Sequence, residues 1–213
     1  MKLNATIANL RLFNSGVYKD VTISFPTTTE KIHSALRKIA IDGRENKEIL
    51  ITQYETDIKG LAAHLGEYEN IDELNYLASR LAGFSPYEMA VFSAAVQHGE
   101  YSNSMQDLIN LSYNLDCFTL YPDIMDAETY GRTLLEDIEE LEIPEEVKPY
   151  IDYEAYGEDR RINEGGDFTA LGYVLNNRTP FKDVYDGFAV PKEYAVFSYP
   201  FRTISPRLPE ASA

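Results

Sequence analysis

Carboxylates are the side chains of this chain whose number and spacing most plainly suggest chemistry. Two carboxyl groups that flank a cleft can hydrolyse a glycoside by general acid and base catalysis. Between Leu61 and Asp159 there are twenty-two Asp and Glu residues against three Lys and Arg. Close carboxylate pairs arise by chance at this density, whereas catalysis needs two or three perturbed groups in a cleft. A carboxylate-dependent hydrolase is therefore the less favoured alternative.

The other reactive residue types form no recognisable catalytic or metal centre. His33, His64 and His98 fall on separate expected helices without ligand spacing, and Cys117 lies within an apolar stretch. The chain contains no HExxH, CxxC, P-loop or GxSxG motif. We therefore expect no catalytic residue, no cofactor and no metal.

Two short motifs have ordinary structural interpretations. Glu164-Gly-Gly-Asp167 resembles part of a glycine-rich loop, but it precedes an expected strand instead of joining a strand to a helix, which favours a turn. Asp123, Asp126 and Glu128 lack the alternation and the glycine of an EF-hand, so they do not predict a calcium site.

The net charge of −16 is concentrated in the middle of the chain. Residues 1–60 carry a net charge of +2, residues 61–159 carry −19 and residues 160–213 carry +1. Adaptation to salt or selection for solubility would spread acid along the whole chain. An acidic block predicts a cationic partner and repulsion from nucleic acid, so the expected partner is a basic protein surface.

The acid is densest from Asp123 to Asp159, where fourteen Asp and Glu face only Arg132 and Lys148. An expected helix from Asp126 to Leu141 would span about 24 Å. Over that length duplex DNA carries about fourteen negative charges. Seven acids and one Arg lie between Asp126 and Glu142. This density suits imitation of one face of DNA, and a solvated acidic surface is the alternative.

Local helix stability does not explain the pattern. Glu136 and Glu140 are four residues apart, a spacing at which like charges repel. Glu139, Glu140 and Glu142 also crowd the helix C-terminus, where the macrodipole disfavours carboxylates.

The elements around this block predict a mixed α+β chain. Strands are expected at 5–12, 18–25 and 48–54, with a capping box at Thr27-Thr-Thr-Glu30 opening a helix through Ile39. This ββαβ unit forms a first domain, residues 1–60. Asn70, Ser85 and Ser104 are expected to cap helices at 71–81, 86–98 and 104–113. These helices form a central domain, residues 61–115.

An acidic α+β domain, residues 116–178, follows. It comprises a strand at 116–121, the acidic helix, a short helix from Pro144 to Tyr150 and a strand at 167–174. From 179 to 213 the chain is rich in Pro and aromatic residues without periodicity, which predicts an irregular arm that docks its aromatic side chains.

Cysteine use and hydropathy predict a soluble cytoplasmic protein. Cys117 is the single cysteine, so no disulfide within the chain can form. The N-terminal residues lack a signal peptide's apolar region, and no apolar run of 18 residues occurs.

Several stretches resemble the ArdA antirestriction proteins, DNA mimics of conjugative elements. They are Ile7-Ala-Asn-Leu-Arg-Leu-Phe-Asn-Ser-Gly16, Tyr54-Glu55, Asn70-Ile-Asp-Glu-Leu-Asn75 and, most specific, Tyr150-Ile-Asp-Tyr-Glu-Ala-Tyr-Gly-Glu-Asp159. The resemblance runs from about Ala5 to Asn177. It implies an elongated three-part α+β molecule, usually dimeric, that performs no chemistry and occupies the DNA-binding groove of type I restriction–modification enzymes.

The resemblance and the distribution of charge along the sequence together indicate which carboxylates would imitate phosphates. The first candidates are Asp126, Glu128, Glu136, Asp137, Glu139, Glu140, Glu142, Glu145 and Glu146. The secondary candidates are Glu67, Glu69, Asp72, Glu73, Glu88, Glu100, Asp107, Asp116, Asp123, Asp152, Glu154, Glu158 and Asp159. Tyr150, Ile151, Tyr153 and Tyr156 are candidates for a homodimer contact, and a core position suits them equally well.

Two features depart from the family pattern: a longer loop from Ile41 to Lys47 and the arm after Arg178. The alternative function from another class is an acidic binding module for a different basic DNA-binding protein, such as a transcription factor or a relaxase.

Overall fold

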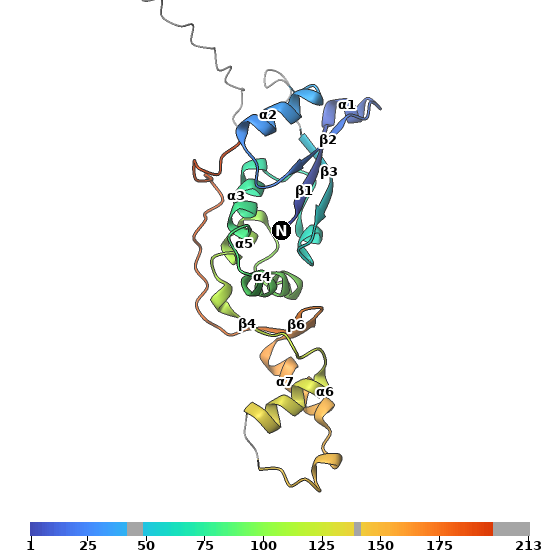
Figure 1. Ribbon diagram of the computed structural model, residues 1–213, viewed down its shortest axis with the longest axis vertical. Helices are drawn as coiled ribbons and strands as arrows, with labels where there is room; N and C mark the ends of the chain where they lie inside the picture. Colours follow the sequence, from blue (N-terminus) through green and yellow to red (C-terminus); the bar gives the residue numbers. More distant parts are fainter. Residues whose placement is uncertain (42–48, 139–141, 198–213) are drawn as a thin grey trace, which may run out of the picture.

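The computed structural model describes residues 1–41, 49–138 and 142–197. The molecule is elongated and of mixed α+β class. A three-stranded sheet lies near one end and helices α6 and α7 lie at the other, with a second small sheet above them (Figure 1). The predicted fold class is thereby confirmed. The expected loop through residues 42–47 lies outside the described residues.

The first sheet has the order β2-β1-β3 with antiparallel pairs. It contains β1 (Leu3–Asn9), β2 (Asp20–Ser24) and β3 (Ile49–Thr56). The expected first strand ends three residues early, because the Asn9 side chain accepts a hydrogen bond from Leu12 N at 3.2 Å and starts the short helix α1 (Leu10–Asn14).

Helix α2 (Thr29–Lys38) covers this sheet (Figure 1). The predicted capping box is wrong by one residue. Thr28, not Thr27, is the N-cap, and its hydroxyl accepts from Lys31 N at 3.5 Å. Ile32 and Leu36 are fully buried on the side that packs into the core.

Three helices follow where their caps predicted them: α3 (Ile71–Leu81), α4 (Pro86–His98) and α5 (Met105–Leu111). Ser85 and Glu88 form a reciprocal capping box, with N···O distances of 2.7 and 3.3 Å. A single 3₁₀ turn, η1 (Leu61–His64), precedes these helices. Their N-cap side chains satisfy backbone N–H groups that a helix leaves unpaired, which explains why local sequence defined them.

The second sheet has the antiparallel order β4-β6-β5. Its strands are β4 (Phe118–Tyr121), β5 (Asp167–Thr169) and β6 (Gly172–Asn176), and the 3₁₀ turn η2 (Leu115–Cys117) leads into β4. The single strand expected at 167–174 is wrong. The Thr169 hydroxyl accepts from Leu171 N and donates to Gly172 O, closing a hairpin turn there.

Helices α6 (Ala127–Thr133) and α7 (Tyr153–Glu164) dominate the end of the molecule that we call the acidic lobe, residues 123–138 and 142–164. The expected helix from Asp126 begins one residue later, with Asp126 as its N-cap, and it continues as a π-helical turn, η3 (Leu134–Ile138), in place of one regular helix to Leu141. Residues 139–141 lie outside the described part of the chain.

The predicted short helix from Pro144 to Tyr150 is also wrong. That segment is a turn followed by the 3₁₀ turn η4 (Lys148–Tyr150). Helix α7 was not predicted at all, because Gly157 lies in its middle and few apolar residues mark a stripe.

A pair of glycines explains how α7 forms. A methyl group at Gly131 of α6 would overlap the carbonyl oxygen of Tyr153, and one at Gly157 of α7 would overlap that of Ala127. The two helices therefore cross with their backbones in contact. Packing on α6 stabilises a helix whose own sequence is a poor helix former.

The hydrophobic core is divided unevenly. One continuous cluster includes the first sheet, α2 to α5 and strands β4 and β6. A separate, smaller cluster of Ile124, Tyr130, Leu134 and Tyr173 supports the acidic lobe, with the Tyr130 and Tyr173 ring centroids 4.1 Å apart. No helix of the described residues is long and apolar enough to cross a membrane.

Candidate acidic binding surface

Nine of the predicted carboxylates make no hydrogen bond or ion pair with another described residue. Six of them belong to the acidic lobe, on η3, on α7 and in the loops around them. The nine are Glu67, Asp107, Asp116, Asp123, Asp137, Glu142, Glu146, Glu154 and Asp159. Except for the half-buried Asp107, all are exposed. Their charges face solvent and are free to meet a partner.

A second set of predicted carboxylates is already engaged within the chain. These residues cap helices, hold loops or pair with Arg and Lys: Glu69, Asp72, Glu73, Glu88, Glu100, Asp126, Glu128, Glu136, Glu145, Asp152 and Glu158. Glu139 and Glu140 lie outside the described residues. The structure thus divides a set that the sequence treated as uniform.

Glu136 is the most engaged carboxylate of the lobe. Its Oε1 accepts a hydrogen bond from the Tyr153 hydroxyl at 2.6 Å, and its Oε2 lies 3.2 Å from Lys148 Nζ. Arg132 reaches it at 3.6 Å while stacking on the Tyr153 ring. The hydrogen bond from Tyr153, followed by the contacts with Lys148 and Arg132, lowers the pKa of Glu136. The two bases of the acidic segment therefore bind η3 to the start of α7.

Hydrogen bonds also lower the pKa of two carboxylates that take part in helix caps, Asp126 and Glu88. Asp126 accepts from Thr129 N at 2.8 Å, and this backbone hydrogen bond lowers its pKa. The Ser85 backbone lowers the pKa of Glu88 in the same way. Both side chains are exposed, so each combines a structural role with a negative charge on the surface.

Asp72 and Glu73 on α3 instead face the C-terminal arm. Asp72 Oδ1 accepts from Val196 N and Phe197 N at 2.6 Å each, and Glu73 accepts from the Tyr185 hydroxyl at 2.7 Å. Burial raises the pKa of Glu73, which opposes its ionisation. Of all the secondary candidates, these two have the arm as their partner.

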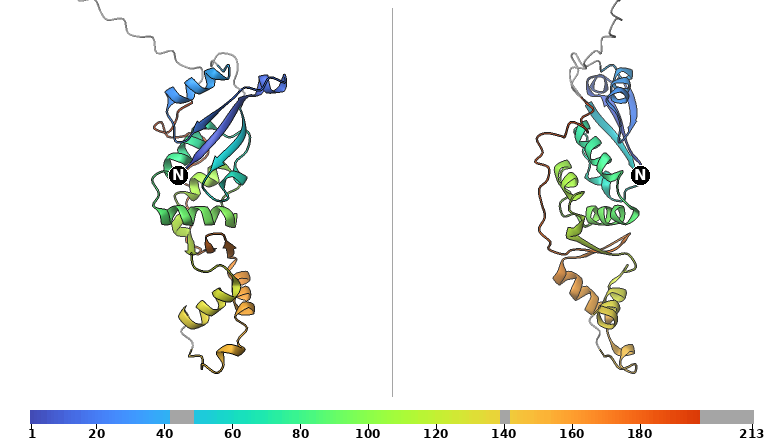
Figure 2. Two further views of the ribbon diagram at one scale, coloured as in Figure 1. Left: turned by 45° about the vertical axis from the view of Figure 1, so that its right-hand side comes forward. Right: turned by 60° about the vertical axis from the view of Figure 1, so that its left-hand side comes forward.

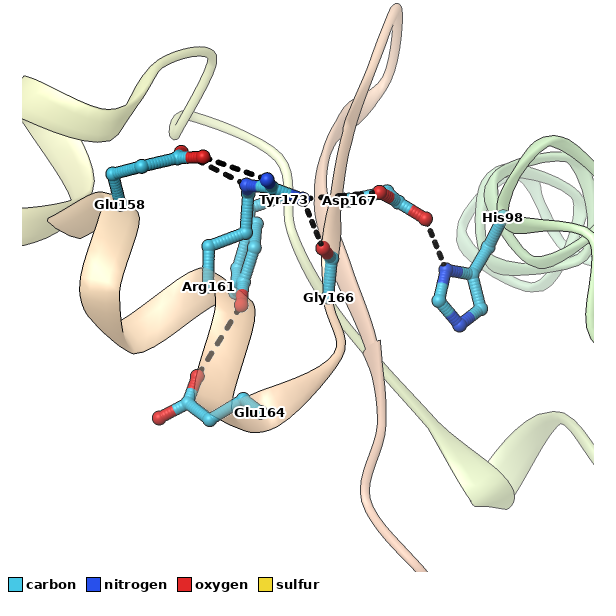
Figure 3. Close-up of polar contacts among 7 residues, drawn as sticks. All are labelled: His98, Glu158, Arg161, Glu164, Gly166, Asp167 and Tyr173. Carbon is cyan, nitrogen blue, oxygen red and sulfur yellow. Dashed lines mark hydrogen bonds and ion pairs between the residues drawn. The ribbon is translucent and has the colours of Figure 1, made fainter.

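A polar junction that the sequence did not reveal joins the lobe to the body (Figure 3). His98 Nδ1 of α4 lies 2.7 Å from Asp167 Oδ2 of β5, and Arg161 of α7 lies 3.5 Å from the other oxygen of Asp167. Arg161 also holds Glu158 through two hydrogen bonds, at 2.7 and 2.9 Å. His98 and Asp167 are 69 positions apart in the sequence, so no local motif could have marked their contact.

Glu164 was predicted only as part of the turn Glu164-Gly-Gly-Asp167 and not as one of the surface carboxylates. It accepts hydrogen bonds from the hydroxyls of Tyr130 and Tyr173, at 2.5 and 3.2 Å, and pairs with Arg160 at 3.1 Å. It therefore closes the small tyrosine-rich core of the lobe, and desolvation raises the pKa of both tyrosines.

The four aromatic and apolar residues predicted as a dimer contact differ in exposure. Tyr153 is 4% exposed and packs within its own chain, whereas Tyr150 is 88% exposed. Ile151 and Tyr156 are half-buried. Within one chain Tyr150 is the member of this group that presents a surface to a second molecule.

The described residues contain no group of three or more His, Cys, Asp and Glu side chains placed to hold a metal ion. A shallow depression of about 410 Å³ beside α6 and α7 includes Arg132, Lys148 and Glu128 in its lining. Glu128 and Lys148 are already paired, with Arg132 at 3.1 Å and Glu145 at 2.7 Å respectively. The charged side chains of this region are spread over an open surface, which suits binding through many separate charge contacts.

A family model of the antirestriction protein ArdA matches residues 5–175. The chain belongs to the ArdA family. No curated protein sequence matches the chain. Membership implies an antirestriction function, and the matched region includes both sheets and the whole acidic lobe of this ArdA protein. The predicted arm, residues 179–213, lies beyond the match, and the structure describes its residues 179–197.

Proposed function

We propose that this ArdA protein is a DNA mimic that occupies the DNA-binding groove of type I restriction–modification enzymes and so protects incoming mobile DNA. The observation that carries the proposal is the set of exposed carboxylates of the acidic lobe that have no partner among the described residues, at one end of an elongated molecule. A partner with Lys and Arg placed to hold phosphates would meet these charges without reading any base.

The division of carboxylates supports this function over a solvated surface alone. Arg132, Lys148 and Arg161 pair with Glu136 and Glu158. Asp137, Glu142, Glu146, Glu154 and Asp159 are exposed and have no base beside them among the described residues. Uncompensated like charges destabilise a fold by their mutual repulsion. Binding to a cationic partner would explain why the surface retains these carboxylates despite their mutual repulsion.

In this proposal the protein performs no reaction of its own and acts in the cytoplasm by occupying its target. Residues 61–159, the central block, carry a net charge of −19, so the central blocks of two chains together carry −38. At one charge per about 1.7 Å, the net charge of two central blocks matches roughly 65 Å of duplex. A homodimer is therefore the form we propose for the active protein.

A competition experiment tests the proposal. The purified protein is titrated into the methyltransferase core of a type I enzyme bound to labelled duplex, at low and at high salt. We expect displacement of the duplex, with an apparent affinity that falls steeply as salt rises, because exposed charge pairs are screened.

Retention of the duplex at both salt concentrations, with the protein in large excess, would contradict DNA mimicry of this target. A pull-down from cell extract would then show whether the acidic surface binds another basic DNA-binding protein. An affinity that does not change with salt would also contradict the proposal, since it would indicate an apolar contact instead.

A further inference from the structure

The arm, residues 179–197, lies along helices α3 and α5 as an extended segment without helix or strand. It runs from the second sheet along one side of the body toward the first (Figure 2). Tyr185 and Val196 are each only 5% exposed, so the arm is packed into the body at both ends. We call the surface that receives it the α3–α5 groove.

Two buried asparagines of the groove bind the arm through its main chain. Asn114 Nδ2 donates to Lys182 O, and its Oδ1 accepts from Lys182 N, both at 2.9 Å. Asn110 Oδ1 accepts from Val184 N and Tyr185 N, and its Nδ2 donates to Tyr185 O at 2.9 Å. Both asparagines are 2% exposed. Asn110 lies on α5 and Asn114 in the turn that follows it, where Asn114 Nδ2 also donates to Asn110 O at 2.8 Å.

The pattern continues along α3. Asn75 Nδ2 donates to Tyr194 O at 2.8 Å, and Asp72 accepts the last two backbone N–H groups of the described arm. The groove thus pairs with backbone N–H and C=O groups of the arm, as a sheet edge does when it binds an extended peptide. Such recognition places few demands on the side chains of the peptide.

Aromatic side chains give the arm its position. The Tyr185 hydroxyl donates to Glu73, and its ring meets the edge of Tyr76, with centroids 5.7 Å apart. Tyr194 stacks on the ring of Tyr76, with centroids 4.6 Å apart. A buried aromatic residue in a pocket, with main-chain hydrogen bonds on both sides, is the arrangement by which peptide grooves hold a ligand.

The hinge that leads into the arm is short and strained. Asn177 Nδ2 fixes its start by donating to Asp116 O at 2.8 Å, and Pro180 restricts its end. Between them Arg178 has a φ of 65°, in the left-handed region that residues with a side chain rarely adopt. Extension of this hinge would relieve the strain.

We propose that the α3–α5 groove is a peptide-binding site that takes the arm of a second copy, so that two chains exchange arms to form a dimer. None of the contacts described above requires the arm to belong to the same molecule. An empty groove would leave the side-chain amide of Asn110 and the Oδ1 of Asn114 without the partners described above, so an arm must fill it. Short, strained hinges favour exchange of a segment between identical chains. The exchange would supply a contact for the homodimer of the proposed function, but it does not require DNA mimicry.

A disulfide between groove and arm tests the exchange in the full chain. A Cβ at Gly187 would lie 3.9 Å from Gln106 Cγ, so the double variant Gln106→Cys with Gly187→Cys joins the arm to whichever groove holds it. The native Cys117 is buried. We expect denaturing electrophoresis without reductant to show covalently linked dimers, in a fraction that grows when the protein is concentrated before oxidation.

Arg178→Gly in the same background is the matched control. Glycine adopts the left-handed conformation freely, so the strain at the hinge is removed. We expect the fraction of linked dimers to fall and that of internally linked monomers to rise. Internally linked monomers alone, at every concentration tested, would overturn the proposal.

A mixing experiment serves if the strained Cys at position 187 prevents linkage. One full-length variant has a damaged groove, Asn110→Ala with Asn114→Ala, and the other a damaged arm, Tyr185→Ala. Exchange would combine an intact arm with an intact groove, so the mixture should contain a species that melts above either variant. A mixture that melts as the sum of its parts would contradict exchange.

Discussion

At the scale of single residues, the carboxylates of this chain differ by what they contact. Glu136 is held by a tyrosine and two bases, whereas Glu146 faces solvent without a partner among the described residues. Both belong to the same acidic segment and would be interchangeable in a count of charges. Substitution of Glu136 should therefore lower the stability of the fold, whereas substitution of Glu146 should leave stability unchanged and remove only a surface charge.

Glu136→Gln should destabilise the fold in a pH-dependent way. The pKa of Glu136 is lower in the folded state, so its charge contributes stability above the ordinary glutamate pKa, and this contribution is lost as pH falls through the lowered value. The variant should melt below the wild type at neutral pH, and the gap should close between about pH 5 and pH 3. Thermal unfolding followed by circular dichroism across that range measures the gap.

Glu146→Gln is the matched control, since it removes the same charge from an exposed side chain without a partner. Its melting temperature should follow that of the wild type at every pH. A gap for Glu136→Gln that stays constant down to pH 3 would show that the lost contribution is packing and not ionisation.

At the scale of elements, two contacts hold parts that local sequence does not stabilise: the glycine crossing of α6 and α7 and the asparagine contacts of the arm. Both place backbone atoms of one element against another. Each depends on the absence of a side chain or on the presence of one amide, so small substitutions should have large effects.

Gly131→Ala should destabilise the acidic lobe by about 1–3 kcal/mol, because the added methyl group overlaps the Tyr153 carbonyl and forces the helices apart. Helix propensity alone would give the opposite sign, by about 0.5–1 kcal/mol. Urea denaturation followed by far-UV circular dichroism measures the difference.

Gly83→Ala provides the control for that prediction. A Cβ at Gly83 meets only the Arg80 carbonyl oxygen, at an ordinary 3.5 Å. Its stability should equal or exceed that of the wild type. Equal stability of the Gly131 and Gly83 variants would mean that the helix crossing tolerates a side chain.

Asn110→Ala should release the arm. It removes three hydrogen bonds to the arm's main chain at a buried site and leaves the Val184 and Tyr185 N–H groups without partners, at a cost of about 2–4 kcal/mol. Limited proteolysis should then cut within residues 181–197, sites that are resistant in the wild type. The exposed Asn103→Ala, which lies just before the N-cap of α5, should leave the arm resistant.

At the scale of the whole molecule, the proposed function rests on many weak charge contacts distributed along the lobe. Exposed ion pairs each contribute little, and several together contribute substantially. Loss of one carboxylate should therefore be tolerated, while loss of several from one surface should not. The arm removes Asp72 and Glu73 from this surface, so the outer side of the lobe should dominate.

The triple variant Asp137→Asn, Glu142→Gln, Glu146→Gln should weaken displacement of duplex from the type I methyltransferase core by more than tenfold at low salt. The reason is that each lost charge pair contributes on the order of 0.5 kcal/mol or more in an interface. The competition titration measures the change, and its dependence on salt should become shallower.

The matched control removes three charges elsewhere: Asp20→Asn, Asp183→Asn and Glu193→Gln, all exposed and outside the lobe. Displacement by this variant should remain close to that of the wild type. An equal loss in both triples would indicate that net charge, and not the surface of the lobe, governs inhibition.

The sequence by itself determined the elements whose signals are local. Asn70, Ser85 and Ser104 marked the starts of α3, α4 and α5, because a cap bonds backbone groups within its own first turn. The segregation of charge and the mixed α+β class were likewise visible, since both follow from composition and periodicity.

Only the tertiary structure decided what depends on distant neighbours. Helix α7 forms because Gly157 lets it lie against α6, and a glycine read locally argues against a helix. Whether a carboxylate is free, as Glu146 is, or engaged, as Glu136 and Asp72 are, depends on residues up to 125 positions away. The sequence shows which side chains are charged, but the tertiary packing determines which residue neutralises each of them.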